Sequence, residues 1–162
     1  MVRRVLDRLD LVLNATKTKI VNSHEESFVF LGFKLQTRRS FKSGKLYPHV
    51  EPAGKSMGKI KAEVRRLTAR ERSMIPIEDV IADLNIRLRG WVGYFRYGNS
   101  YSSLNHLKIF VENRVASHLG SRHKIRLFRR SLAKYPAKRL YEEYGLYKIP
   151  VTVGWKQANA SK

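Results

Sequence analysis

The sequence contains no cysteine. This absence excludes disulfide bonds and cysteine-based zinc sites, and it fits a reducing compartment. No apolar run approaches the ~18 residues that a membrane-spanning helix requires, and no secretory signal follows Met1. We therefore expect a protein that is neither secreted nor inserted in a membrane, located in the bacterial cytoplasm or in an organellar matrix.

Acidic residues are scarce. The chain has 13 Asp and Glu against 33 Lys and Arg, which gives 162 residues a formal net charge of +20. An excess of this size destabilises the compact state by self-repulsion unless a polyanion screens it. Because 43% of the residues are hydrophobic, the chain can still bury a core. Nucleic acid is the expected partner, and an anionic membrane surface is the alternative.

Patterns for catalysis or metal binding are missing as well. The five histidines show no ligand spacing, and no catalytic triad, phosphate-binding loop or paired-carboxylate arrangement stands out. Asp79 and Asp83 lie four residues apart and could hold a metal on a helix, but Arg87 offers Asp83 a simpler ion pair one turn further along. We expect no catalytic residue, no bound metal, no cofactor and no small-molecule substrate.

The apolar pattern and the chain breaks divide the sequence near residue 53. The first part, 1–53, predicts a short helix at 2–13, strands at 17–21 and 28–35 around a polar turn, and an extended segment at 46–50. The second part, 54–150, predicts helices at 55–70, 77–97 and 102–119, with Gly120 as the stop, and two helical pieces within 121–148 split at Pro136. Residues 151–162 are expected to be a flexible tail. The predicted fold class is α+β, a helix and β-hairpin followed by an all-helical domain.

The most strongly patterned segment runs from residue 77 to residue 95. Its apolar residues, at 77, 80, 81, 84, 88, 91, 92 and 95, follow the spacing of one helix face. Trp91 and Phe95 lie on this face and are expected in the core. Tyr94 and Tyr97 lie off it, where stacking on a base and plain surface packing are equally plausible.

Basic residues are clustered in segments of one sign. Residues 121–139 contain eight Lys or Arg and no acid, residues 55–72 contain seven against Glu63 and Glu71, and residues 34–45 contain five. A solvated protein face normally mixes charges of both signs. Single-signed clusters interleaved with aromatic residues such as Phe128, Tyr135 and Tyr141 favour polyanion binding instead.

The residues expected to contact RNA come from three predicted helices and from the basic segment after them. They are Lys55, Lys59, Arg65, Arg66, Arg87, Arg89, Tyr94, Arg96, Tyr97, Arg122, Lys124, Arg126, Arg129 and Arg130.

Three blocks of the sequence resemble the reverse transcriptases, or maturases, of group II introns. Residues 11–20 and 28–33 are similar to the end of the polymerase palm, residues 52–56 to the junction into the thumb, and residues 77–95 to the maturase motif of the thumb, also called domain X. The resemblance implies a primer-grip-like turn, which holds a primer 3′ end in that family, at Phe30, Leu31, Gly32 and Phe33.

The sequence also departs from that family. It has no Tyr-x-Asp-Asp turn to hold the polymerase metals, no cysteine for an endonuclease module, and Asp10 where the family usually has glycine. The resemblance therefore implies a C-terminal fragment, in which 1–53 is a palm remnant and 54–150 a thumb-like maturase domain.

Two functions follow from the resemblance and a third from charge alone. The first is a maturase-type domain without a polymerase site of its own, which binds structured intron RNA and assists splicing. The second is the thumb subunit of a split reverse transcriptase completed by a separately encoded palm, which an unpaired palm strand edge would favour. The third is a generic basic nucleic-acid binder, for which intron RNA is no better than random RNA.

Overall fold

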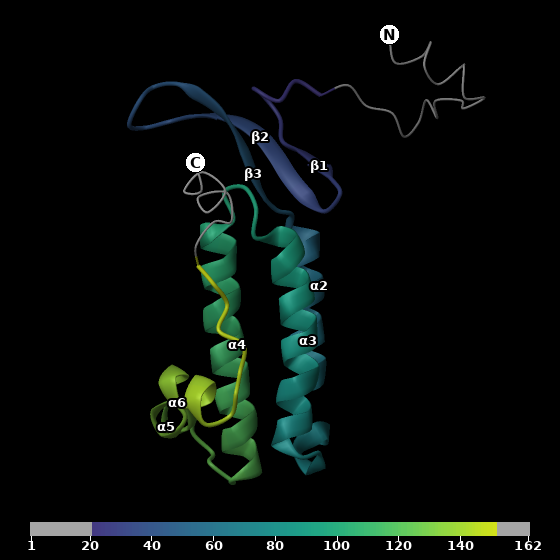
Figure 1. The fold of residues 1–162 in the computed structure, drawn as a ribbon, viewed down its shortest axis with the longest axis vertical. Helices are drawn as coiled ribbons and strands as arrows, with labels where there is room; N and C mark the ends of the chain where they lie inside the picture. The colour runs from purple at the N-terminus through teal and green to yellow at the C-terminus, as the bar shows by residue number, and fades with distance from the viewer. Residues whose placement is uncertain (1–20, 152–162) are drawn as a thin grey trace, which may run out of the picture.

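The computed structural model describes residues 21–151. It has a three-stranded antiparallel sheet in the order β1-β2-β3, followed by helices, so the predicted α+β class is confirmed (Figure 1). The helix predicted at 2–13, most of the strand predicted at 17–21 and the tail after residue 151 lie outside the described residues.

The sheet differs from the predicted hairpin. β1 (Phe28–Phe30) and β2 (Phe33–Arg39) pair across a two-residue turn, where the prediction was one strand at 28–35. The turn residues Leu31 and Gly32 have φ values of 48° and 81°, which suit the right-handed twist of a tight hairpin. β3 (Leu46–Pro52) then pairs with the whole of β2 and confirms the third extended segment.

The helices run back and forth away from the sheet. α2 (Gly54–Leu67) leads away from it, a short 3-10 helix η1 (Arg70–Met74) makes the turn, and α3 (Ile77–Phe95) returns (Figure 1). α4 (Tyr101–Arg122) leads away again, and α5 (Phe128–Lys134) and α6 (Ala137–Glu142) lie beside its far half. We call the end that carries η1 and the α4–α5 loop the distal end.

The helix faces predicted from spacing form the core. Ile60, Val64 and Leu67 of α2 are buried as predicted. Six of the eight predicted α3 positions are buried, and Ile77 and Trp91 pack on the core while partly exposed. Trp91, expected in the core, thus packs at its edge, where the centre of its ring lies 4.6 Å from that of Phe95.

The end of α4 corrects a second prediction. Gly120 does not stop the helix but lies buried inside it, and a Cβ added there would meet Ser131 Oγ at 2.0 Å and its Cβ at 2.7 Å. Glycine is therefore needed for the close approach of α5, not for a turn. The helix ends later, where Lys124 N–H donates to Ser121 O and Ile125 N–H to Gly120 O. Lys124 has φ 56°, so it takes the left-handed position that usually holds glycine.

Gly120→Ala should lower the free energy of unfolding by about 1–3 kcal/mol, because the added methyl group overpacks the α4–α5 contact. Gly58→Ala is the matched control, since Gly58 is exposed on α2 with nothing within 4 Å of an added Cβ. The control should gain about 0.5–1 kcal/mol from the loss of backbone freedom in the unfolded chain. Chemical denaturation measures both, and equal shifts would contradict the packing role of Gly120.

One histidine is buried among arginines on α4. His118 is 3% exposed. Burial lowers the pKa of its imidazole, and the charges of Arg122, Arg114 and Arg72 lower it further. Below the ordinary histidine pKa of about 6.5, the unfolded chain therefore binds a proton that the folded chain resists, and stability must fall as the pH drops.

His118→Gln should therefore weaken the loss of stability on acidification. We expect the wild type to lose about 1 kcal/mol more than this variant between about pH 7.5 and pH 5.5. Thermal unfolding at both pH values is the measurement, and His106→Gln, at an exposed position of the same helix, is the control. If His118→Gln and the wild type show the same pH dependence, His118 does not resist protonation in the folded state.

Candidate nucleic-acid interface

Two arginines of α4 fix the connection between α2 and α3 at the distal end. Arg114 donates from Nε to Thr68 Oγ1 and from Nη2 to Thr68 O, both at 3.1 Å. Arg122 donates from Nη1 to the Ile75 carbonyl oxygen. These bonds satisfy carbonyl groups that the ends of α2 and η1 leave unpaired, and they hold η1 against α4.

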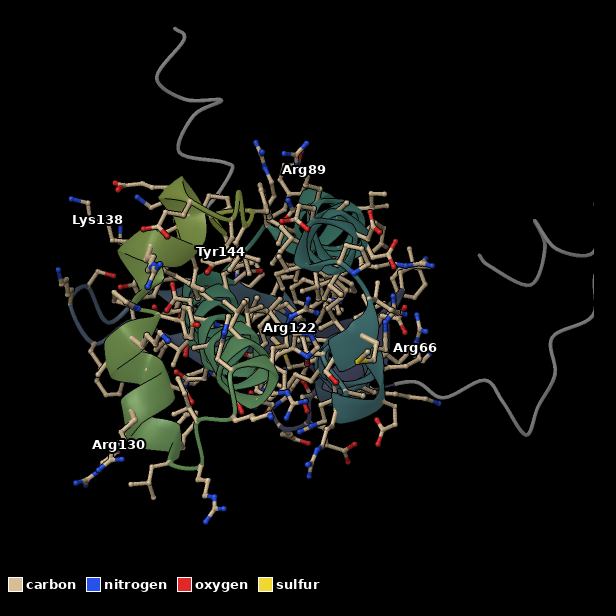
Figure 2. The ribbon with its side chains drawn as sticks, turned by 90° about the horizontal axis from the view of Figure 1, so that it is seen from below. Arg66, Arg89, Arg122, Arg130, Lys138 and Tyr144 are labelled. Atoms are coloured by element: carbon tan, nitrogen blue, oxygen red, sulfur yellow. The ribbon has the colours of Figure 1, made fainter. Side chains whose placement is uncertain are left out.

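Arg122 is therefore placed differently from the other predicted RNA contacts. Figure 2 views the molecule from the distal end and shows Arg122 between the helices, whereas Arg130 and Lys138 reach outward. Its guanidinium is partly buried and engaged by the chain's own backbone. A run of basic residues cannot show which of its members the fold itself uses.

Two adjoining clefts open at the distal end, and both are lined by residues of the α4–α5 loop. The α5 cleft, of about 520 Å³, is lined by Lys124, Ile125, Arg126, Arg130 and Lys134. The η1 cleft, also about 520 Å³, is lined by Arg70, Ser121, Lys124, Ile125 and Arg126. Among residues 21–151, no acidic side chain lines either cleft.

The structure thus brings together three of the predicted RNA-contact residues, Lys124, Arg126 and Arg130, and adds two that were not predicted. Lys134 belongs to the same basic segment, 121–139, so the sequence could have predicted it. Arg70 is 54 positions before Lys124 and joins the cleft only because η1 packs against α4. Arg129 is exposed on α5 without lining a cleft.

The cations of the clefts lack acidic partners. Within the part of the chain that the structure describes, Arg70, Lys124, Arg126 and Arg130 form no ion pair. Like charges that converge in a concave site with no internal counter-charge raise the local concentration of anions. The clefts are therefore suited to phosphate groups.

The α2–α3 face carries a second set of arginines, and these are paired. Arg66 binds Glu63 through two hydrogen bonds of 2.9 and 2.7 Å, and Arg87 lies 3.5 Å from the same carboxylate. The hydrogen bonds from Arg66 lower the pKa of Glu63. The expected pair between Asp83 and Arg87 is wrong, because Arg72 of η1 reaches Asp83 at 3.1 Å and Arg87 instead faces α2.

Two further predicted arginines lie over aromatic rings. The Arg65 guanidinium carbon is 5.1 Å from the centre of the Phe110 ring, and that of Arg89 is 5.5 Å from the Tyr147 ring. Both side chains stay exposed and can still meet a partner (Figure 2 shows Arg89 pointing outward). The aromatic rings hold the two guanidinium groups in place, but they leave the positive charges without an acidic partner.

The remaining predicted contacts lie toward the sheet. Lys55 and Lys59 are exposed on the first turns of α2. Arg96 is partly buried, with its guanidinium 5.5 Å from the ring of Tyr97, which is 53% exposed. Tyr94 is 51% exposed. The structure therefore separates these residues from the distal clefts along the length of α2 and α3 (Figure 1).

The primer-grip-like turn is docked on the start of α2 and the end of α3. Gly32 O accepts hydrogen bonds from Ala53 N–H at 2.8 Å and from Ser56 Oγ at 2.9 Å. Tyr94 donates from its hydroxyl to Leu31 O at 3.1 Å, and the ring of Phe33 stacks on Tyr94 at 5.5 Å.

The outward side of this turn is apolar and open. Phe30 is 62% exposed and Leu31 is 67% exposed. Together with Val29, which is 65% exposed, they form an apolar tip on the sheet.

Among residues 21–151, no three His, Cys, Asp or Glu side chains gather where they could hold a metal ion. No helix in the same range is long and apolar enough to cross a membrane.

The chain matches one known family. Residues 57–136 match the group II intron maturase-specific domain, a range that includes η1, α3, α4, α5 and both distal clefts. That domain is not itself the catalytic part of the polymerase, and it implies a role in group II intron splicing. None of the curated proteins compared with the chain matches it. The match therefore identifies residues 57–136 as a group II intron maturase-specific domain.

Proposed function

We propose that the protein binds structured group II intron RNA through the two distal clefts and thereby assists splicing, while the RNA supplies the chemistry. The observation that carries this proposal is the set of cations around the α4–α5 loop, which line both clefts without an acid among them. Binding there releases the counterions condensed on the RNA, so affinity should depend steeply on salt.

The backbone of Lys124 supports this assignment. A residue with a side chain costs about 1–2 kcal/mol in the left-handed region, which glycine enters freely. Lys124 occupies that region with φ 56° and lines both clefts. Strain of this kind is concentrated at functional sites, where the side chain is required for something other than folding.

The arrangement also suggests how the protein can help an RNA to react. Intron segments that must approach each other repel through their phosphates. Two clefts that share Lys124, Ile125 and Arg126 can hold two phosphate-bearing segments side by side. The shared cations then offset the repulsion at the point where the segments meet.

A second function is favoured by the apolar tip at Val29, Phe30 and Leu31. Within residues 21–151, β1 pairs only with β2 and its other edge is unpaired, and an unpaired apolar edge is a surface to which another chain can bind. A separately encoded polymerase palm could cover it, which would make this chain the thumb subunit of a split reverse transcriptase. In that case the apolar tip, not the distal clefts, carries the essential contact.

Lys124→Gly tests the first function, because it should affect folding and binding in opposite directions. The variant should unfold at the same or a higher denaturant concentration, with a gain of up to about 1 kcal/mol, since glycine relieves the left-handed strain. Its affinity for folded intron RNA should fall several-fold, and the slope of log affinity against log salt should flatten by about one unit.

Lys42→Gly is the matched control, because it removes the same charge from an exposed loop of the sheet. It should change affinity much less than Lys124→Gly. A Lys124→Gly protein that keeps its affinity and salt slope would contradict the distal site. Failure of the chain to bind intron RNA alone, together with tight binding to a palm polypeptide through the apolar tip, would favour the split enzyme.

A further inference from the structure

Phe128 is an exposed aromatic residue in the segment that borders the α5 cleft, although its own side chain does not line that cleft. It begins α5 and is 50% exposed, and Leu127 before it is 56% exposed. Arg126 and Arg130, which line the α5 cleft, stand two positions on either side of it in the sequence. The exposed half of this apolar ring adds nothing to the stability of the fold, because only buried apolar surface stabilises the folded chain.

Two other rings near basic residues of the helical part already have cation partners. Tyr135 is 2% exposed, and the guanidinium carbon of Arg139 lies 5.2 Å from its ring. Phe110 is partly buried under Lys61 and Arg65.

Phe128, by contrast, has no ring or cation contact within residues 21–151. One face of its ring is therefore available for a flat partner.

The backbone that carries Phe128 is well fixed. Leu127 O accepts hydrogen bonds from Arg130 N–H at 3.0 Å and from Ser131 N–H at 3.1 Å. Ser131 in turn packs against Gly120, which leaves no room for even a methyl group between α4 and α5. A ring held on such a support needs little ordering when it binds, so its stacking energy would be retained as affinity.

We propose that Phe128 stacks on an unpaired base of the RNA whose neighbouring phosphates lie in the α5 cleft. This inference rests on the proposed function and narrows its partner to RNA with a bulged or looped nucleotide beside a helix. Bases inside an intact duplex have both faces covered by their neighbours, so they cannot stack on a side chain. Unstacked bases are the ones that proteins capture on aromatic side chains.

The test compares two RNAs that differ by one nucleotide. One is an uninterrupted duplex, and the other carries a single bulged 2-aminopurine, whose fluorescence falls when it stacks. The wild-type protein should bind the bulged RNA about tenfold more tightly than the duplex, which is within the range of one base–aromatic stack. Binding should also quench the 2-aminopurine fluorescence.

Phe128→Leu keeps an apolar residue that favours helix formation but removes the flat ring. It should lose the preference and the quenching while its affinity for the uninterrupted duplex stays unchanged. Phe128→Trp should keep both, because it restores a flat ring. Phe41→Leu makes the same change at a fully exposed phenylalanine in the β2–β3 loop, at the other end of the molecule, and should leave both unaffected.

Four results separate the two proposals. Equal binding of both RNAs by the wild type, or full preference in Phe128→Leu, overturns the stacking inference while leaving RNA binding by the clefts intact. Equal loss in Phe41→Leu also overturns it, because the effect would not be specific to the α5 site. Binding of neither RNA by the wild type overturns the proposed function itself and the inference with it.

Discussion

The distal end depends on hydrogen bonds from α4 arginines to the backbone of the α2–α3 connection. Arg114 binds Thr68 at the end of α2, and Arg122 binds the Ile75 carbonyl just before α3. A guanidinium group is well suited to bind such carbonyl groups, because a hydrogen bond from a charged donor is stronger than one between two neutral groups. Without these bonds η1 would not be held beside the α4–α5 loop, and Arg70 would not face Lys124 across the η1 cleft.

The basic residues differ along the molecule in whether the protein's own acidic residues pair with them. On the α2–α3 face, Glu63 compensates two arginines, and Asp83 is bound by Arg72. Around the distal clefts the described residues provide no such partner, so the repulsion there is left for a polyanion to relieve. Binding of RNA and stabilisation of the folded protein are therefore expected to reinforce each other.

The sequence predicted the elements whose burial follows a regular spacing, and the faces of α2 and α3 agree with the structure almost residue for residue. The sequence-based prediction failed at two places where the backbone angle of a single residue decides how an element turns or ends. The segment through Gly32 is apolar on both sides, so alternation could not reveal the hairpin turn, and Gly120 suggested a helix end that Lys124 makes instead.

For the candidate site, the sequence predicted that it is basic but not which residues form it. A basic run cannot show that Arg122 is taken up by the fold, or that Arg70 arrives through a tertiary contact.

The central claim is that RNA lies against the distal clefts, and ultraviolet crosslinking of the full chain to folded group II intron RNA tests it most directly. The crosslinked peptides, identified by mass spectrometry, should come from the stretch 121–134 and from the peptide that contains Arg70, because these residues line the clefts. Crosslinks confined to the sheet, at 28–39, with none at 121–134, would contradict the account and assign RNA binding to the opposite end of the molecule.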